Sequence, residues 1–146
     1  MSRTIDAAKR VISGTFGEVW LNGEKVAECM GCQGKLAKNK EKIYLCGQLI
    51  SDHKVMSMDG TGSLTLYKVD SGLIQKQSGV QNGEDQRFTI VSALKDPDSY
   101  GAERIAFYNV SFDDLTLADW QRAAVGKVTA PFTFTRYELL DLVPVN

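Results

Sequence analysis

The segment Gly60-Thr-Gly-Ser-Leu-Thr-Leu-Tyr-Lys-Val69 gives the clearest indication of the fold. In an extended chain, successive side chains point to opposite faces, so Leu64 and Leu66 share one face while Ser63 and Thr65 share the other. One apolar face and one polar face are typical of a strand in an antiparallel sheet that is buried on one side only. The segment therefore predicts a half-buried strand.

The sequence around this strand predicts further strands and one short helix. Asn22-Gly23 is a strong two-residue hairpin signal, because a type I′ turn needs positive φ at both positions. Asp70-Ser71 is a candidate N-cap, and Gly79 is a candidate stop for a helix between them. Strands are predicted at about residues 15–21, 25–38, 42–45, 60–69, 86–94, 102–112 and 127–139.

These elements predict a mainly β fold, an antiparallel β-barrel or sandwich with one short flanking helix at about residues 71–79. The 146 residues are 43% hydrophobic and 24% charged, which is typical of one globular domain over residues 1–146. Seventeen basic and eighteen acidic residues give a net charge of −1, so no basic surface for nucleic acid or an anionic membrane is predicted. The sequence shows neither a secretion signal nor an apolar run long enough to span a membrane, so we expect the chain to stay in the cytosol.

Residues 46–60, Cys46 to Gly60, show neither a helix period nor a strand period. A fifteen-residue connection is long for a compact domain, and such loops are usually functional or disordered. Its apolar content argues against disorder, so the loop either folds back over its own core or, as we favour, contacts a neighbouring protein chain. The predicted interface residues are Leu49, Ile50, His53, Val55, Met56 and Met58.

A face of small neutral polar groups recurs on several predicted strands. Ser63, Thr65 and Thr89 lie opposite apolar neighbours, as do Thr133 and Thr135. Such a face is the solvated side of any antiparallel sheet, or it lines an aqueous passage.

The sequence offers little for catalysis or metal binding. Cys29, Cys32, Cys46 and His53 could in principle form a Cys3His zinc site, but no second ligand pair follows, and Cys29 and Cys32 on one strand are expected to point to opposite faces. Small buried thiols in a reducing compartment are the favoured interpretation. His53 is the only histidine and no nucleophile elbow, zinc-protease or phosphate-loop motif is present, so no enzyme activity, catalytic residue, cofactor or metal is predicted. Trp20 and Trp120 are predicted core or interface anchors.

Several segments, in their order and spacing, resemble one known family. They are Ile12-Ser-Gly14, Gly17-Glu-Val-Trp-Leu-Asn-Gly-Glu24, Gly47 with His53-Lys54, Asp59–Val69, Glu103-Arg104 with Phe112-Asp113, Pro131-Phe-Thr-Phe134 and Tyr137-Glu-Leu-Leu-Asp141. From Ile12 to Asp141 the chain resembles the tail tube proteins of contractile-tailed phages of Gram-positive hosts, their defective prophages and R-type bacteriocins.

The resemblance implies a structural subunit that assembles as stacked hexameric rings around a central conduit inside a sheath. It implies that residues 46–60 reach a neighbouring subunit, and that the N-terminal arm (residues 1–14) and the C-terminal tail (residues 139–146) help contact the next ring. The implied partners are the same chain, a sheath protein, and baseplate, initiator and tape-measure proteins. DNA would pass without specific binding, and the subunit itself would not bind a membrane.

The resemblance also implies a location, first in the cytoplasm of the bacterial host during assembly and then in a virion tail or a bacteriocin particle. The residues leave DNA ejection and membrane puncture both open. They also leave a second class of function open, a monomeric β-barrel that binds a small ligand in its interior.

Overall fold

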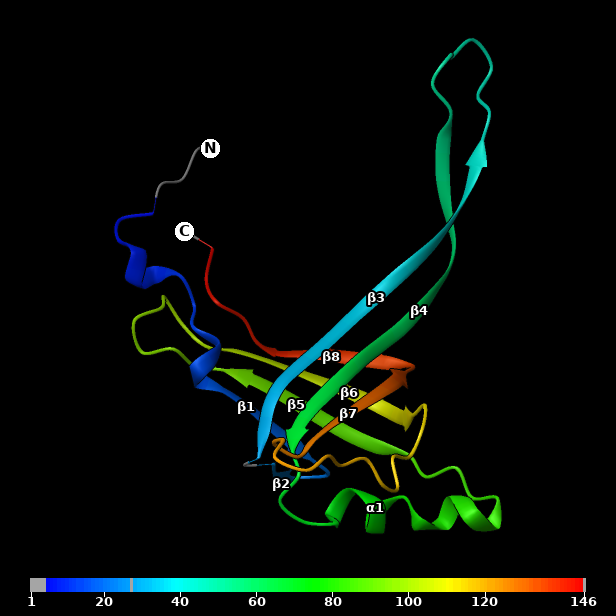
Figure 1. Cartoon of the computed structure of the whole chain (residues 1–146). Coiled ribbons are helices and arrows are strands. Elements are labelled where there is room, and N and C mark those ends of the chain that lie inside the picture. The colour runs from blue at the N-terminus through cyan, green and yellow to red at the C-terminus, as the bar shows by residue number, and fades with distance from the viewer. Residues whose placement is uncertain (1–4, 27, 146) are drawn as a thin grey trace.

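The computed structural model describes residues 5–26 and 28–145, and in these ranges the chain forms one antiparallel sheet with a long projecting hairpin (Figure 1). The strands are β1 (Gly17–Leu21), β2 (Glu24–Lys25), β3 (Cys29–Ile43), β4 (Asp52–Tyr67), β5 (Phe88–Leu94), β6 (Glu103–Phe112), β7 (Lys127–Phe134) and β8 (Arg136–Asp141). The helical segments are α1 (Gly72–Lys76) and the 3₁₀ turns Ala8–Arg10, Gly14–Phe16 and Ser78–Asn82. No helix in these ranges is long and apolar enough to cross a membrane.

The sheet folds over on itself because β6 belongs to two layers. Its residues 104–108 pair with β8 and its residues 103–110 with β5, whereas Ser111 and Phe112 pair with β7. The strand order is β2-β1-β5-β6-β7-β4-β3, with β8 attached to β6. The mainly β, antiparallel prediction is confirmed, and the described strands form a sandwich-like sheet that is not closed into a barrel.

The core lies between the two layers. Leu64 and Leu66 are buried, as the alternation in residues 60–69 predicts. The rings of Phe107 and Phe134 lie 4.8 Å apart between centroids, and Phe132 is fully buried beside them. The buried apolar cluster consists of Val19, Leu21, Leu64, Leu66, Phe88, Ile90, Phe107, Val110, Ala130, Phe132 and Phe134.

Two glycines of β4 let this strand lie directly on the phenylalanine rings. A Cβ at Gly60 would meet the carbonyl oxygen of Phe134 at 2.6 Å, and a Cβ at Gly62 would meet the ring of Phe132 and the carbonyl oxygen of Gln33. Only a residue without a side chain fits at this approach of strand to ring.

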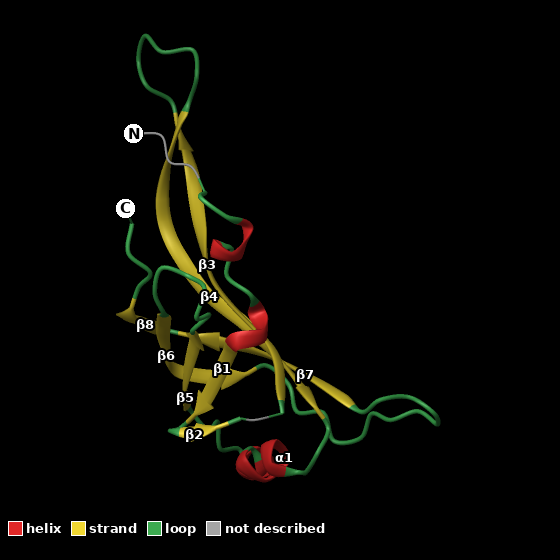
Figure 2. Ribbon diagram, turned by 90° about the vertical axis from the view of Figure 1, so that its left-hand side faces the viewer, coloured by secondary structure: helices red, strands yellow, loops and turns green. Residues whose placement is uncertain are grey.

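Beyond Gly60, β3 and β4 leave the body as a twisted two-stranded ribbon, which we call the arm (residues 35–59) (Figures 1 and 2). The prediction of a structureless segment at residues 46–60 is wrong for residues 52–60, which lie in β4, and the turn occupies residues 44–51. Likewise, the strands predicted at residues 25–38 and 42–45 are not separate, because β3 continues through residues 39–41 with a register shift between Asn39 and Lys40. A strand with solvent on both faces has no burial alternation, so its sequence carries no strand period.

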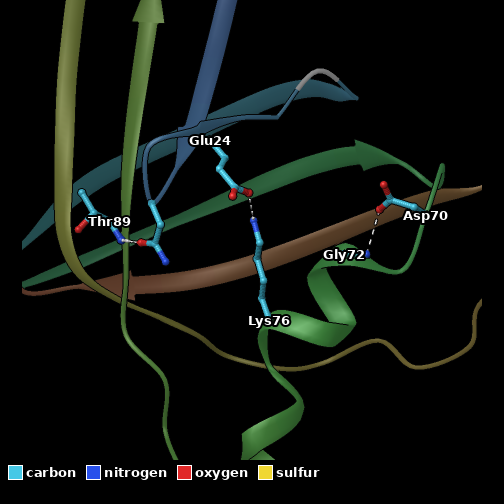
Figure 3. Close-up of polar contacts among 6 residues, drawn as sticks. Glu24, Asp70, Gly72, Lys76 and Thr89 are labelled. Atoms are coloured by element: carbon cyan, nitrogen blue, oxygen red, sulfur yellow. Dashed lines mark hydrogen bonds and ion pairs between the residues drawn. The ribbon is translucent and has the colours of Figure 1, made fainter.

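The helix predicted at residues 71–79 is present as α1 followed by the 3₁₀ turn Ser78–Asn82. The Ser71 side chain does not cap it; instead the backbone N–H of Gly72 donates to Asp70 Oδ1 at 2.9 Å (Figure 3). Lys76 donates to Glu24 Oε2 at 3.2 Å and so ties α1 to β2. The helix therefore flanks the sheet, as predicted.

The C-terminal region differs from the sequence prediction. The strand predicted at residues 127–139 breaks at Thr135 into two strands with different partners. β7, before the break, pairs with β4, and β8, after it, pairs with β6. The tail predicted at residues 139–146 consequently begins inside β8. Within the N-terminal segment predicted at residues 1–14, the described part contains the 3₁₀ turn Ala8–Arg10. Residues 1–4, Ala27 and Asn146 lie outside the described residues.

Candidate assembly surfaces

The tip of the arm is apolar and uncharged. Residues 44–51 contain no charged side chain, and they connect the two strands of the arm far from the core. Tyr44 and Ile50 are each 80% exposed, and Leu49 is fully exposed. Contiguous apolar exposure of this kind marks an interaction surface.

The predicted interface residues fall into two groups. Leu49 and Ile50 lie in the tip, whereas His53, Val55, Met56 and Met58 lie on β4. All six are exposed on the arm, so the structure brings them to one projecting element.

Strand register divides the arm into two faces of different charge. Three pairs, Lys38 with Met58, Lys40 with Val55 and Lys42 with His53, continue the face on which Leu36 pairs with Gly60. We call the seven exposed side chains of this face, together with the position of Gly60, the inner face of the arm. The name reflects that Leu64 and the core lie on the same side of the ribbon. Its members are Leu36, Lys38, Lys40, Lys42, His53, Val55 and Met58.

The carboxylates of the arm all lie on the opposite face. Glu41, Asp52 and Asp59 alternate with the inner-face positions, and Asn39 Nδ2 donates to both Asp59 Oδ2 and Ser57 Oγ at 3.0 Å on that side. The inner face therefore carries three lysines and no acid. The sequence reasoning missed this cationic stripe, although lysine at every second position of a strand was a readable signal.

The polar residues proposed for a passage do not share one surface. Ser63 and Thr65 lie on the outer face of β4, where they pair with Pro131 and Thr129 of β7. Thr89 lies on β5 in the other layer, held at the hairpin turn by a hydrogen bond from its backbone N–H to Asn22 Oδ1 at 2.8 Å (Figure 3). Because the two layers pack core to core, their outer faces point away from each other.

The connection between β6 and β7, residues 113–126, forms a second exposed surface. Residues 117–125 are all exposed, among them Leu117 at 70%, Trp120 at 82% and Val125 at 68%. Trp120 is therefore not a core residue, and an interface role stays a prediction for it.

The cysteines do not gather into one site. A register shift between Cys29 and Gly31 brings Cys29 and Cys32 opposite Leu66 and Leu64, so both thiols face the core and the expectation of opposite faces is wrong. Burial raises the pKa of Cys29 and raises that of Cys32 to about 11. Cys46 is exposed in the turn at the far end of the arm, so the expectation of a buried thiol is wrong for this residue. No metal-binding cluster of three ligands occurs in the described part of the chain.

The gap between β1 and β3 opens as a groove of about 630 Å³. Its walls include Cys32 and Gly34 from β3, Ser92 from β5 and Phe107 from β6. The two layers thus meet at an open flank, while phenylalanine rings fill the space between them.

Comparison with known proteins identifies the family. The family described as "Phage tail tube protein" matches residues 5–141. Two Bacillus subtilis (strain 168) proteins, "Phage-like element PBSX protein XkdM" and "Uncharacterized protein YqbM", are each 33% identical over 136 residues, which cover 90% of this chain and 92% of theirs. The tube fold recurs in an extracellular contractile injection system, the PVC sheath-tube complex in its extended state, at 12% identity and a TM-score of 0.72 over 96% of this chain and 100% of that one. The chain belongs to the phage tail tube protein family.

Proposed function

We propose that the chain is the structural subunit of a contractile tail tube, which assembles as stacked hexameric rings that form the inner conduit inside a sheath. The observation that carries this proposal is the arm. It extends apolar and cationic side chains into solvent, and no other described element of the same chain covers it.

Assembly would cover the unpaired sheet edges of the free chain. The strand order ends at β2 and β3, and β8 pairs with β6 alone, so these strands present unpaired edges that would otherwise pair with unrelated chains. A head-to-tail contact between different surfaces of identical subunits closes into a ring when the rotation fits, and a ring supports stacking.

The interface residues are Leu49, Ile50, His53, Val55, Met56 and Met58, which contact a neighbouring subunit. The chain ends, residues 1–14 and 139–146, contact the adjacent ring. A sheath protein surrounds the tube, baseplate and initiator proteins start it, and a tape-measure protein occupies it. The subunit acts without catalysis.

The passage is lined by the outer face of β3, β4 and β7. Ser63 and Thr65 lie there beside Thr129 and Thr133, a neutral hydroxyl-rich surface that would not hold DNA by counterion release. Thr89, in the opposite layer, does not share this surface, so Ser63 and Thr65 are the lining residues that the geometry favours. The same conduit serves DNA ejection or membrane puncture, and the particle forms in the host cytoplasm before it is released.

A lumen role for Thr65 predicts that Thr65→Lys leaves rings and tubes intact but slows DNA passage. Six lysines per ring would attract phosphate and retain the passing strand. Ejection from tailed particles measures the effect, with Thr89→Lys in the opposite layer as the control. Unchanged ejection by Thr65→Lys tubes would remove Thr65 from the lining.

The proposed function is tested by negative-stain microscopy of the purified chain across a concentration range, with light scattering after gel filtration. We expect rings or tubes at high concentration, because assembly follows mass action. A sharp monomer at every concentration, even with baseplate proteins present, contradicts the proposal. That result would favour the monomeric ligand-binding alternative, for which the open groove between β1 and β3 would be the site.

A further inference from the structure

The lysines of the inner face of the arm have no carboxylate partner among the described residues, and Lys42 Nζ lies 5.8 Å from the centroid of the Tyr44 ring. Lys38, Lys40 and Lys42 follow one another at every second position, about 7 Å apart along the strand. None of the three forms an ion pair with another described residue. Met58 and Val55 lie beside them and are exposed, so a complementary surface must be both anionic and apolar.

The connection between β6 and β7 has this complementary character. Residues 113–126 contain Asp113, Asp114 and Asp119 against the single cation Arg122, which gives a net charge of −2. Asp119 adjoins Trp120, and Leu117 and Val125 are exposed on the same connection. We call residues 113–126 the anionic loop. Its three carboxylates form no ion pair within the described ranges 5–26 and 28–145.

The two surfaces lie apart in the described part of the chain. The anionic loop runs into β7 at Lys127, which pairs with Tyr67 at the body end of β4, and Gly126 accepts a hydrogen bond from the backbone of Lys68 there. The other end of the anionic loop lies nearer, because the backbone N–H of Asp113 donates to the carbonyl oxygen of Pro131, which pairs with Ser63. Met58 lies five residues from Ser63 and nine from Tyr67 along β4, so about 15–30 Å of strand separates it from the two ends of the loop. Figure 1 shows the arm leaving the body on the side away from this end of β4.

We propose that the anionic loop of one copy docks on the inner face of the arm of a second copy. Trp120 packs on Met58 and Val55, and the aspartates pair with the lysine stripe. A tryptophan surrounded by charge pairs is a typical hot-spot arrangement, and complementary charges fix the register of the docked loop. The inference rests on the proposed function, and it names the surface that receives the arm.

Photocrosslinking tests the contact directly. Trp120 is replaced by benzoylphenylalanine, and ¹⁴N and ¹⁵N chains are mixed before assembly so that crosslinks between copies are distinguished by mass. We expect crosslinked peptides that join position 120 to residues 36–42 or 53–58 of the other copy. Val80, 52% exposed on the 3₁₀ turn after α1, is the control position and should give no such crosslink.

Charge reversal gives a second readout. We expect K38E/K40E/K42E and D113K/D114K/D119K each to lower the assembled fraction about tenfold or more, and their combination in one chain to restore it. K35E/K54E changes charges on the other face of the arm and should stay near wild type.

Tubes that form normally but crosslink position 120 to another segment, or only to added sheath protein, would overturn this inference and leave the proposed function intact. Parent variants that assemble like the wild type, or a combined variant that assembles no better than its parents, would do the same. Absence of any wild-type assembly would overturn both.

Discussion

At the scale of single residues, the close approach of β4 to the phenylalanine rings predicts a sharp difference between two glycines of the same hairpin. Gly62→Ala forces its Cβ against the Phe132 ring and the Gln33 carbonyl oxygen, so we expect a loss of about 1–3 kcal/mol in the free energy of unfolding. Gly31→Ala meets no heavy atom within 4 Å and should change stability by less than about 0.5 kcal/mol. Urea unfolding measures both, and equal stabilities of the two variants would refute the packing argument.

The thiols predict selective chemistry. With its pKa raised to about 11, Cys32 is about one part in a thousand thiolate at pH 8, and burial also raises the pKa of Cys29, so only exposed Cys46 should react quickly with iodoacetamide. Because the folded pKa of Cys32 lies above the ordinary 9.0, its neutral form stabilises the fold below about pH 9, and that contribution is lost as the pH rises toward 11. Mass spectrometry follows the labelling, with Cys46→Ser as the control. Rapid single labelling of Cys46→Ser would contradict the assignment.

Which residues are buried was largely predictable where one face of a strand meets the core. Leu64 and Leu66 show the alternation because the body covers one side of β4 only. The common face of Cys29 and Cys32 was not predictable, since it depends on a register shift that the partner strand imposes.

At the scale of elements, the stability of the body does not depend on the arm, because every residue of the buried cluster lies outside residues 35–59. We therefore expect replacement of residues 38–58 by Asn-Gly, which joins Ala37 to its partner Asp59 through a two-residue turn, to leave the thermal midpoint of the body nearly unchanged. The same deletion should abolish rings. Circular dichroism and microscopy provide the two measurements, and tubes formed by the armless chain would contradict the role of the arm.

The elements that pack on the core were predicted close to their true bounds, as β5 and β6 show. The prediction of a loop from residue 46 to residue 60 fails because both faces of the arm are exposed in the single chain, so no burial alternation marks β4 there. The apolar side chains that made the segment conspicuous are nevertheless the exposed residues of the arm.

At the scale of the whole molecule, the sequence predicted the layers but not their connection. The division of β6 between β8 and β7, and the break at Thr135 that allows it, depend on long-range pairing that no local pattern carries. The open flank between β1 and β3 follows from that arrangement, and β3 ends the strand order there.

Assembly should therefore change stability unevenly across the molecule, and hydrogen exchange measures this. In the free subunit the arm is a two-stranded ribbon without a core. The free energy of local opening at residues 37–43 and 52–58 should therefore be no more than about 1 kcal/mol, while the amides of β4 residues 62–66 should exchange slowly. If a neighbouring subunit holds the arm in assembled tubes, as proposed, the protection of the arm amides should rise toward that of the body. Gly62→Ala, which weakens the body, serves as the control, because it should speed exchange in β4 without removing the gain in the arm. Equal arm protection in free and assembled protein would mean that the arm is not part of the subunit contact.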